Sequence, residues 1–447
     1  MTAVTARRIT SDRREIRSWY FYDFANSAFS TTVIAVFFAP YLTAVAESAA
    51  DASGRVSLLG LSVTAESYYP FALSVSVVLQ VLLLPIVGAI ADRLPNKKSL
   101  MGVFAYIGSV ATMALYFVDG TRYQLGGALL LVANLAFGAA IVIYNSFLPD
   151  ICHEDERDKV SSHGWAVGYL GGGLLLVANL ALYSMYESFG LTESQAIRIN
   201  LFSAGAWWAL WTIVPLRGLR KHAPHVRQSG HSPLTAGFTQ LRETFRDARK
   251  YPITLLFLGA YLLYNDGVQT VIAMAAVYAQ RELLLEVDTL VVGILFVQLI
   301  AAVGAWALGR LASYFGAKRV LLASIVMWTF VIGAGFLLPA EEPLLFIALA
   351  SAIGFVLGGS QALSRSIFSL LIPRRSEAEY FSFYEISERG TSWLGTFMFG
   401  LALTITDSYR IAILGLVVFF VVGGLMLTKV NIKAGIEAVG NDVPYRI

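Results

Sequence analysis

Long apolar stretches alternate with short polar segments along almost the whole chain. An α-helix needs about 20 mainly apolar residues to cross the hydrocarbon core of a bilayer, and each stretch is close to that length or longer. The pattern predicts twelve transmembrane helices, six on either side of a polar central segment. We expect them near residues 18–45, 67–91, 99–118, 123–148, 162–186, 196–216, 252–280, 287–309, 318–338, 343–371, 384–406 and 410–428.

These spans divide the chain into two bundles. We predict an all-α integral membrane fold built from two pseudo-symmetric bundles of six helices each. The polar segments then lie outside the membrane. The expected parts are a cytoplasmic N-terminal segment (1–17), an N-terminal bundle (18–216), a cytoplasmic linker (217–250), a C-terminal bundle (251–428) and a cytoplasmic tail (429–447).

The composition supports a membrane protein and excludes several other classes. Of the 447 residues, 57% are hydrophobic and 14% are charged, whereas soluble proteins carry about 25% charged residues. Little of the chain remains for a soluble catalytic domain, so we expect no enzyme activity. The net charge of +3 argues against nucleic-acid binding. One cysteine and five histidines outside the predicted spans or at their ends predict neither a disulfide nor a metal site, and no motif predicts a cofactor.

Lysine and arginine are distributed unevenly between the two sides of the predicted bundle. With twelve spans, 28 of the 33 lysines and arginines fall on the side of both chain ends. Basic residues concentrate on the cytoplasmic side of membrane proteins. We therefore predict a multi-pass protein of the cell (inner) membrane with both termini in the cytoplasm.

The two halves of the chain resemble each other in sequence. Pro149 and Pro373 close the predicted fourth and tenth helices, and Gly171 and Gly395 lie in the fifth and eleventh, with the same separation. Transporters built from repeats show such internal similarity. The sequence therefore indicates a duplicated unit of six helices.

The loop after the second helix carries a first motif, which runs from Gly88 through Asp92 and Arg93 to Lys98. Gly88 permits close helix contact, and Asp92 can accept hydrogen bonds from the N-terminus of a neighbouring helix. We predict a conformational latch formed by Gly88, Asp92 and Arg93. The alternative is an ordinary loop held in the cytoplasm by its basic residues.

Polar residues open the first helix. Asp23, Asn26 and Ser27 have the spacing i, i+3, i+4 and share one helix face. An acid inside an apolar span usually faces a partner or an aqueous cavity, which makes Asp23 and Asn26 candidates for substrate or proton binding. The alternative is that Asp23 lies in the interface and is merely solvated there.

The seventh helix carries a similar group near its middle. Tyr264, Asn265, Asp266 and Gln269 surround Gly267. A carboxylate at this depth is removed from water and can carry a proton, so Asp266 is our leading candidate for a proton-binding residue. The alternative is structural pairing with a basic residue.

Helices 4 and 10 add the remaining candidates. Tyr144 and Asn145 end the fourth helix, and Gln361 and Arg365 lie in the tenth. We expect Arg365 to provide a counter-charge for a substrate carboxylate or for Asp266. The alternative is an arginine that extends to the cytoplasm.

Two further patterns are interpreted as structural. Glu385 and Arg389 have the spacing i, i+4 and predict a local interfacial ion pair. Gly164, Gly168 and Gly172 form a stripe that predicts close helix packing. Such stripes serve packing within a bundle or between copies, and we expect a monomer.

Taken together, these motifs resemble one branch of the major facilitator superfamily, the vacuole-effluxer family of autophagy-related amino-acid effluxers and its bacterial relatives. The resemblance extends over residues 17–428 and suggests the bacterial branch. It implies a twelve-helix alternating-access fold and, from the fungal vacuolar members, efflux of neutral amino acids. It rests on residues 22–28, 164–173, 264–270, 359–366 and 383–385.

The leading hypothesis is a secondary transporter of a small polar solute, amino acids first, coupled to protons through Asp266 and Asp23. Facilitated diffusion replaces this mechanism if neither acid matters. A sugar or a cell-wall fragment is the alternative cargo, because tyrosines can stack on sugar rings. From other classes, a receptor that uses 217–250 for docking and a membrane-embedded enzyme remain as alternatives. We expect a small molecule, the lipid bilayer and protons as partners.

Overall fold

The computed structural model describes residues 11–446 except 59, 95, 222–248, 375 and 390–391. Most of the predicted linker and most of the predicted N-terminal segment therefore lie outside the described residues. The N-terminal half contains α1 (Arg13–Ala28), η1 (Phe29–Phe37), α2 (Phe38–Ser48), β1 (Arg55–Leu58), β2 (Leu61–Thr64), α3 (Ala65–Arg93), α4 (Lys97–Ala114), η2 (Leu115–Phe117), α5 (Tyr123–Asn145), α6 (Leu148–Ile151), η3 (Glu154–Glu156), α7 (Arg157–Ser184), η4 (Tyr186–Phe189) and α8 (Glu193–Gly218).

The C-terminal half consists of helices alone within the described residues. Its elements are α10 (Pro252–Arg281), α11 (Val287–Phe315), α12 (Ala317–Leu337), α13 (Pro343–Leu370), α14 (Glu377–Arg389), α15 (Ser392–Thr406), α16 (Tyr409–Gly415), α17 (Val417–Lys429) and α18 (Ile432–Ala438).

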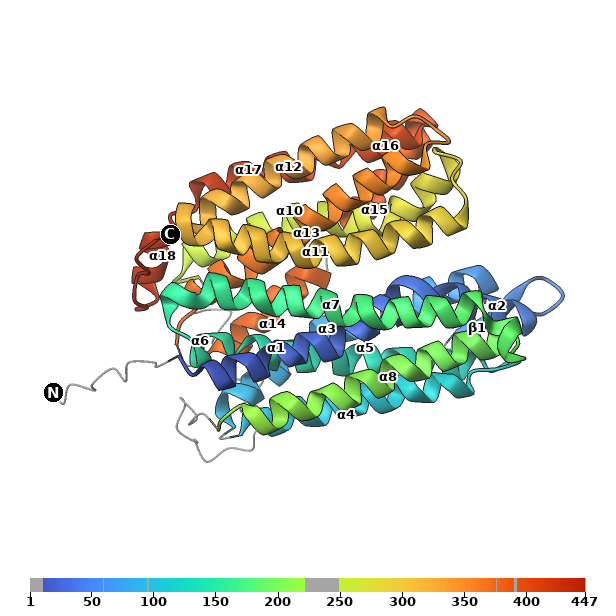
Figure 1. Cartoon of the computed structure of the whole chain (residues 1–447), viewed down its shortest axis with the longest axis horizontal. Coiled ribbons are helices and arrows are strands. Elements are labelled where there is room, and N and C mark those ends of the chain that lie inside the picture. Colours follow the sequence, from blue (N-terminus) through green and yellow to red (C-terminus); the bar gives the residue numbers. More distant parts are fainter. Residues whose placement is uncertain are drawn as a thin grey trace.

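The long helices form two bundles that lie side by side (Figure 1). Each bundle has its own apolar core, with Trp19 and Trp208 fully buried in the first and Trp328 in the second. Large apolar side chains such as Phe330 and Leu344 are instead exposed, at 73% and 80%. Exposed apolar area of this kind marks an interaction surface, and on helices of this length the partner is the bilayer.

The helix count agrees with the predicted fold class. Eleven helices among the described residues are long and apolar enough to cross a membrane. The pair α14 and α15 lies where we predicted the eleventh span. With this pair, the twelve-helix architecture in two halves is confirmed.

Two local features were not predicted. The first span runs from Arg13 to Ser48 and changes to a π-helix at Phe29–Phe37. In the turn before it, the Ser27 hydroxyl donates to the Asp23 carbonyl oxygen at 2.7 Å, and the Thr31 hydroxyl donates to the Ser27 carbonyl oxygen. Side-chain bonds to the backbone of this kind disturb the helical ladder. The second feature is the antiparallel hairpin of β1 and β2, which lies between the first two predicted spans.

The structure supports the internal repeat. Thr270 donates to the Asp266 carbonyl oxygen at 2.7 Å, which reproduces the bond between Ser27 and Asp23 in α1. Gly171 of α7 packs against the backbone of Phe24 in α1, and Gly395 of α15 packs against that of Asp266 in α10. The first and fifth helices of each half therefore pack in the same way.

The start of α1 lies at the same end of the molecule as α6 and α18, and we call this end the termini end (Figure 1). The halves contact each other through two helix groups. In one group, α7 packs against α11 and α13. In the other, α14 packs against α3 and α5. The hydrogen bonds described next join the halves at the termini end and in the turns beside it.

Candidate functional site

The centre of the candidate site is the guanidinium group of Arg365 on α13. Its side chain is 2% exposed and forms a salt bridge with Asp23 of α1, with Nη1 lying 3.2 Å from Oδ2. Nη1 also donates to Oδ1 of Asn145 at 3.3 Å. Nε and Nη2 donate to the Ser161 hydroxyl and carbonyl oxygens at 3.0 and 2.9 Å. Arg365 of the C-terminal half is thus held by three helices of the N-terminal half.

Aromatic rings enclose this ion pair. The guanidinium carbon of Arg365 lies 4.8 Å from the ring centroid of Trp19 and 5.3 Å from that of Trp165. The Tyr144 hydroxyl donates to Oδ2 of Asp23 at 2.7 Å, and its ring stacks on Trp19 at 4.4 Å. Rings exclude water and attract a cation to their faces. The site therefore binds positive charge both through a carboxylate and through aromatic faces.

Glycines in α7 make room for the cluster. A Cβ atom at Gly164 would lie 2.8 Å from the Trp19 ring and 3.0 Å from Nη2 of Arg365. One at Gly168 would lie 3.1 Å from Cβ of Asp23. The predicted packing role of this stripe is confirmed, and the close contact of α1 with α7 brings the ion pair together.

The network continues to α14 in the C-terminal half. Asn145 donates through Nδ2 to Oε1 of Glu385 at 2.9 Å. Arg389 donates through Nε to Oε2 of Glu385 at 3.2 Å, and its guanidinium lies over the Phe137 ring of α5 at 4.6 Å. The predicted pair of Glu385 and Arg389 exists, but the interfacial location was wrong, since Glu385 is 1% exposed and is also bonded to the other half.

A second polar group lies beside it, within the C-terminal half. Gln361 donates to Oδ1 of Asn265 at 2.8 Å, and Asn265 donates to the Glu388 carbonyl oxygen at 3.1 Å. The Tyr261 hydroxyl donates to Oε2 of Glu388 at 3.2 Å. The Tyr264 hydroxyl lies 2.6 Å from the hydroxyl of Ser364 on α13. This group links helices α10, α13 and α14.

Three predicted residues lie outside these networks. Asp266 is 1% exposed and faces the Gly395 side of α15 rather than Arg365. Within the described residues no side chain donates to its carboxylate, and the backbone N–H of Gly395 lies beside it. Asn26 is buried, and among the described residues its Nδ2 has no hydrogen-bond partner. Gln269 is half-buried.

The structure decides between the alternatives given above for Arg365 and for Asp23. Arg365 does not extend to the cytoplasm and does not pair with Asp266, because its guanidinium is buried against Asp23. Asp23 is 9% exposed, so it is not a solvated interfacial acid. Sequence reasoning missed Ser161 and Trp165 because neither residue type is unusual in a membrane span.

The residues of the predicted latch form the last turns of α3, where α3 packs against α14. The two carboxylate oxygens of Asp92 accept hydrogen bonds from the backbone N–H groups of Ala378 and Glu379, each at 3.0 Å. A Cβ atom at Gly88 would lie 2.9 Å from the Ala378 carbonyl carbon. Arg93 is the last residue of α3. The first turn of α14 is therefore held by a carboxylate of the other half, as expected for a helix N-terminus.

A further set of ionic contacts lies near the termini end. Glu154 accepts from Arg157 at 3.0 Å and from Arg374 of the other half at 2.8 Å. Arg157 also donates to a backbone carbonyl of α13 at 2.7 Å. Asp158 accepts from the Ser366 hydroxyl at 2.5 Å. In this structure the halves are closed upon each other at the termini end.

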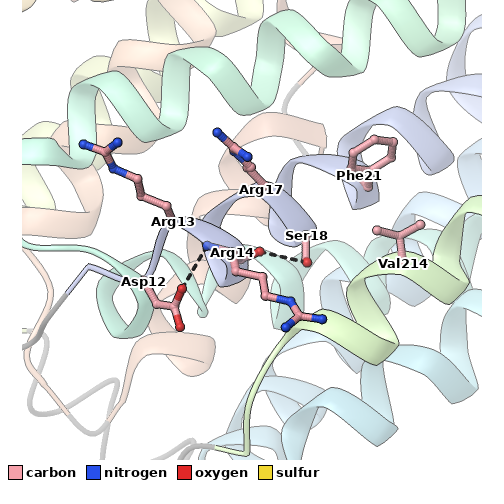
Figure 2. Close-up of a pocket in the computed structure, with 7 residues that line it drawn as sticks. All are labelled: Asp12, Arg13, Arg14, Arg17, Ser18, Phe21 and Val214. Carbon is pink, nitrogen blue, oxygen red and sulfur yellow. Dashed lines mark hydrogen bonds between the residues drawn. The ribbon is translucent and has the colours of Figure 1, made fainter.

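A separate pocket of about 500 Å³ lies at the start of α1, beside α8 (Figure 2). Figure 2 shows the side chains of Arg13, Arg14 and Arg17 around it. The Arg14 N–H donates to Asp12 at 2.9 Å and holds the pKa of that carboxyl below its ordinary value. The pocket is apart from the Arg365 network, and its exposed arginines match the predicted basic side of the membrane.

Comparison with known proteins identifies relatives that match almost the whole of this chain. Residues 11–440 match the family model described as "Vacuole effluxer Atg22 like". An uncharacterized MFS-type transporter YxiO of Bacillus subtilis is 30% identical over 96% of this chain and 98% of its own. Autophagy-related protein 22 of Pyricularia oryzae is 26% identical over 90% of this chain and 74% of its own.

Solved structures share the fold. A bacterial homologue of the iron transporter ferroportin, in an outward-facing state, has a TM-score of 0.66 and 15% identity over 94% of this chain and 99% of its own. The proton:xylose symporter XylE has a TM-score of 0.66 and 12% identity over 93% of this chain and 95% of its own. At these identities the likeness concerns the architecture alone.

Proposed function

Because the chain belongs to the vacuole effluxer Atg22-like family, we propose that this multi-pass transporter of the major facilitator type moves amino acids out of the cytoplasm by alternating access. The observation that carries the proposal is the buried salt bridge between Asp23 and Arg365, which joins the two halves. For the halves to separate at the termini end, this pair must break. The substrate has to compensate both charges.

A zwitterionic amino acid meets that requirement. Its carboxylate can replace Asp23 on the guanidinium of Arg365, and its ammonium group can replace Arg365 beside Asp23. Removing one partner of a buried ion pair costs about 3–5 kcal/mol, because the other charge is left uncompensated. A neutral solute leaves both charges unpaired, whereas a zwitterion leaves neither.

The aromatic surroundings favour neutral amino acids. Trp19 and Trp165 lie on the guanidinium of Arg365, and Tyr169 lies beside Trp165 with 5.6 Å between ring centroids. An apolar side chain packs favourably on such rings. No acidic or basic side chain beyond the Asp23 and Arg365 pair is then needed to match the charges of the substrate.

The orientation of the transporter follows from its basic residues. With the termini end in the cytoplasm, as the lysine and arginine asymmetry favours, the contacts at Asp23, Asp92 and Glu154 close the molecule toward the cytoplasm. Release of Arg365 and of the α14 N-terminus opens it there. We propose Gly88, Asp92 and Arg93 as the latch of this closed form, in the cell membrane.

Proton coupling is part of the proposal, with Asp266 as the carrier. Its carboxyl group is 1% exposed, and no charged partner lies on it among the described residues. Burying an unpaired ionised carboxylate is costly, so such a group favours the neutral, protonated form. Asp23 is the second candidate, since a proton on it weakens its bond to Arg365.

The direct test is uptake into proteoliposomes of pooled labelled amino acids and sugars, without a proton gradient and with a gradient in either direction. We expect gradient-dependent accumulation of amino acids by the wild type and its loss in Asp266→Asn. If accumulation is unchanged in the variant, Asp266 has no part in proton coupling, but the transport function stands.

Two other outcomes would replace the proposed cargo. Accumulation of sugars alone would favour the alternative in which Tyr261 and Tyr264 stack on a sugar ring. No uptake of either class by folded protein would favour a receptor. Scrambling of residues 217–250, most of which lie outside the described structure, would then abolish signalling, whereas a simple linker tolerates it.

A further inference from the structure

Two glutamates on one face of α14 lie in the contact between the halves. Glu385 and Glu388 have the spacing i, i+3 and therefore lie on the same side of the helix. Glu385 is 1% exposed and bonds across the interface to Asn145. Glu388 is half-buried, one turn further from the termini end, and bonds to Tyr261. Both carboxylates therefore bond to protein side chains, whereas acids at a solvated helix end bond to water.

The charges of this cluster do not balance. It holds three carboxylates, those of Asp23, Glu385 and Glu388, and two guanidinium groups, those of Arg365 and Arg389. Among the described residues, the other groups around the cluster are neutral hydroxyls and amides, and the next charges lie near the start of α14. The neutral groups are Tyr144, Asn145, Tyr169, Tyr261, Gln361 and Tyr384, and the next charges are Asp92, Lys97, Glu377 and Glu379.

A closed cluster of this composition retains one excess negative charge when all its acids are ionised. A net charge withdrawn from water is costly, and two carboxylates that share a buried site bind one proton between them. When the halves separate, Asn145 leaves Glu385, Asp23 leaves Arg365, and water reaches both glutamates. Each glutamate then ionises as it does in water.

We propose that Glu385 and Glu388 bind one proton as a pair when the termini end closes and release it when that end opens. This inference rests on the alternating-access function proposed above. It differs from the role of Asp266, which lies between helices of the C-terminal half and touches neither glutamate nor the other half in the contacts described here. Closing is thereby coupled to uptake of one proton at the interface itself.

The proposal has a definite sign. The closed form binds one proton more than the open form, so acid favours closing. Linkage limits the effect to about a tenfold change in the ratio of closed to open molecules per pH unit. A glutamine at either position removes the excess charge and keeps nearly the same shape, so closing no longer requires a proton.

The experiment measures the distance between spin labels on the two halves at the termini end, in lipid nanodiscs without substrate, from pH 5 to pH 8. Cysteines at Lys159 and Lys433, which are both exposed, provide the labelling sites. Cys152 is fully buried, and burial raises the pKa of its thiol to about 12. The parent protein treated with the same label controls for reaction at Cys152.

We expect the population with the short distance to grow as the pH falls. The ratio of closed to open molecules should change about tenfold per pH unit, as binding of one proton requires. Glu385→Gln and Glu388→Gln should each remove that slope and keep the short distance populated at every pH. Glu282→Gln is the matched control and should keep the slope of the parent protein, because this acid of the same half pairs with Arg410 at 2.6 Å beyond the far end of α10, outside the cluster.

Two results would overturn the inference. If Glu385→Gln and Glu388→Gln both keep the slope, or if the control Glu282→Gln removes it, the coupled proton is not bound by this pair. Two distances with populations independent of pH would contradict the inference alone. A single distance under all conditions, with and without amino acids, would contradict the alternating-access function as well.

Discussion

The pairing of Asp23 with Arg365 explains why polar side chains are tolerated in otherwise apolar spans. A charge within a membrane helix is costly unless it meets a partner. Here the partner belongs to the other half, and Ser161 and Asn145 accept three further guanidinium hydrogen bonds. The pair therefore stabilises one conformation of the protein rather than one helix.

The first prediction separates stability from function at this pair. Asp23→Asn leaves Arg365 buried without its counter-charge and should lower the free energy of unfolding by about 3–5 kcal/mol. The double variant Asp23→Asn with Arg365→Met removes both charges and should recover most of the stability. Thermal unfolding in detergent, followed by tryptophan fluorescence, measures both effects.

Transport should respond differently from stability. Neither the single nor the double variant should exchange amino acids, because the double variant folds but lacks both charges that the substrate requires. A double variant that unfolds as easily as Asp23→Asn would show that the pair is not the source of the stability. Transport by the double variant would remove the pair from the binding site.

At the scale of elements, the packing of α1 on α7 positions the site. The helices approach closely because α7 presents glycines to α1, and a Cβ atom at Gly171 would lie 2.8 Å from Cα of Phe24. Small residues allow backbone contact of this kind between membrane helices. The same arrangement recurs at Gly395 in the other half, as the repeat predicts.

The second prediction compares two glycine substitutions. Gly171→Ala should push α1 away from α7, destabilise the protein by about 1–3 kcal/mol through overpacking and reduce transport by displacing Asp23. Gly333→Ala is the control, since a Cβ atom at Gly333 on α12 meets nothing within 4 Å. The control should be neutral or stabilising by up to about 1 kcal/mol. Equal melting temperatures for the two variants would contradict the packing argument.

Sequence patterns predicted these elements unequally. The twelve-helix fold could be predicted because long hydrophobic runs indicate membrane spans and basic residues indicate the side on which each loop lies. The repeat could be predicted from matching residues at a constant separation. The π-helix at Phe29–Phe37 could not, because its apolar run has the same composition as the α-helical spans around it. The hairpin at Arg55–Thr64 lies in a segment too short and too polar to be distinguished from a loop.

The candidate site was predicted residue by residue but not as an arrangement. Asp23 and Arg365 were both selected, yet they are 342 positions apart, and no periodicity within a helix shows which charges of two halves meet. Glu385 was assigned to Arg389 alone because that pair is local. Its bond to Asn145 depends on how the halves close.

At the scale of the whole molecule, the hydrogen bonds and ion pairs described between the halves lie toward the termini end. Asp92 holds the start of α14, Glu154 binds Arg374, and Arg365 joins three helices of the other half. Rocking of one half against the other must break these contacts together. A substrate that satisfies the deepest of them therefore controls the opening of the whole end.

The central claim is that a zwitterion replaces the bond between Asp23 and Arg365. The most direct measurement is counterflow in proteoliposomes, in which a labelled neutral amino acid exchanges against unlabelled compounds loaded inside. We predict exchange against the free amino acid. We predict none against the amine that lacks its carboxylate, against the N-acetylated form that lacks its ammonium charge, or against sugars. Equal exchange against the amine or the N-acetylated form would contradict the claim, because neither can compensate both charges of the pair.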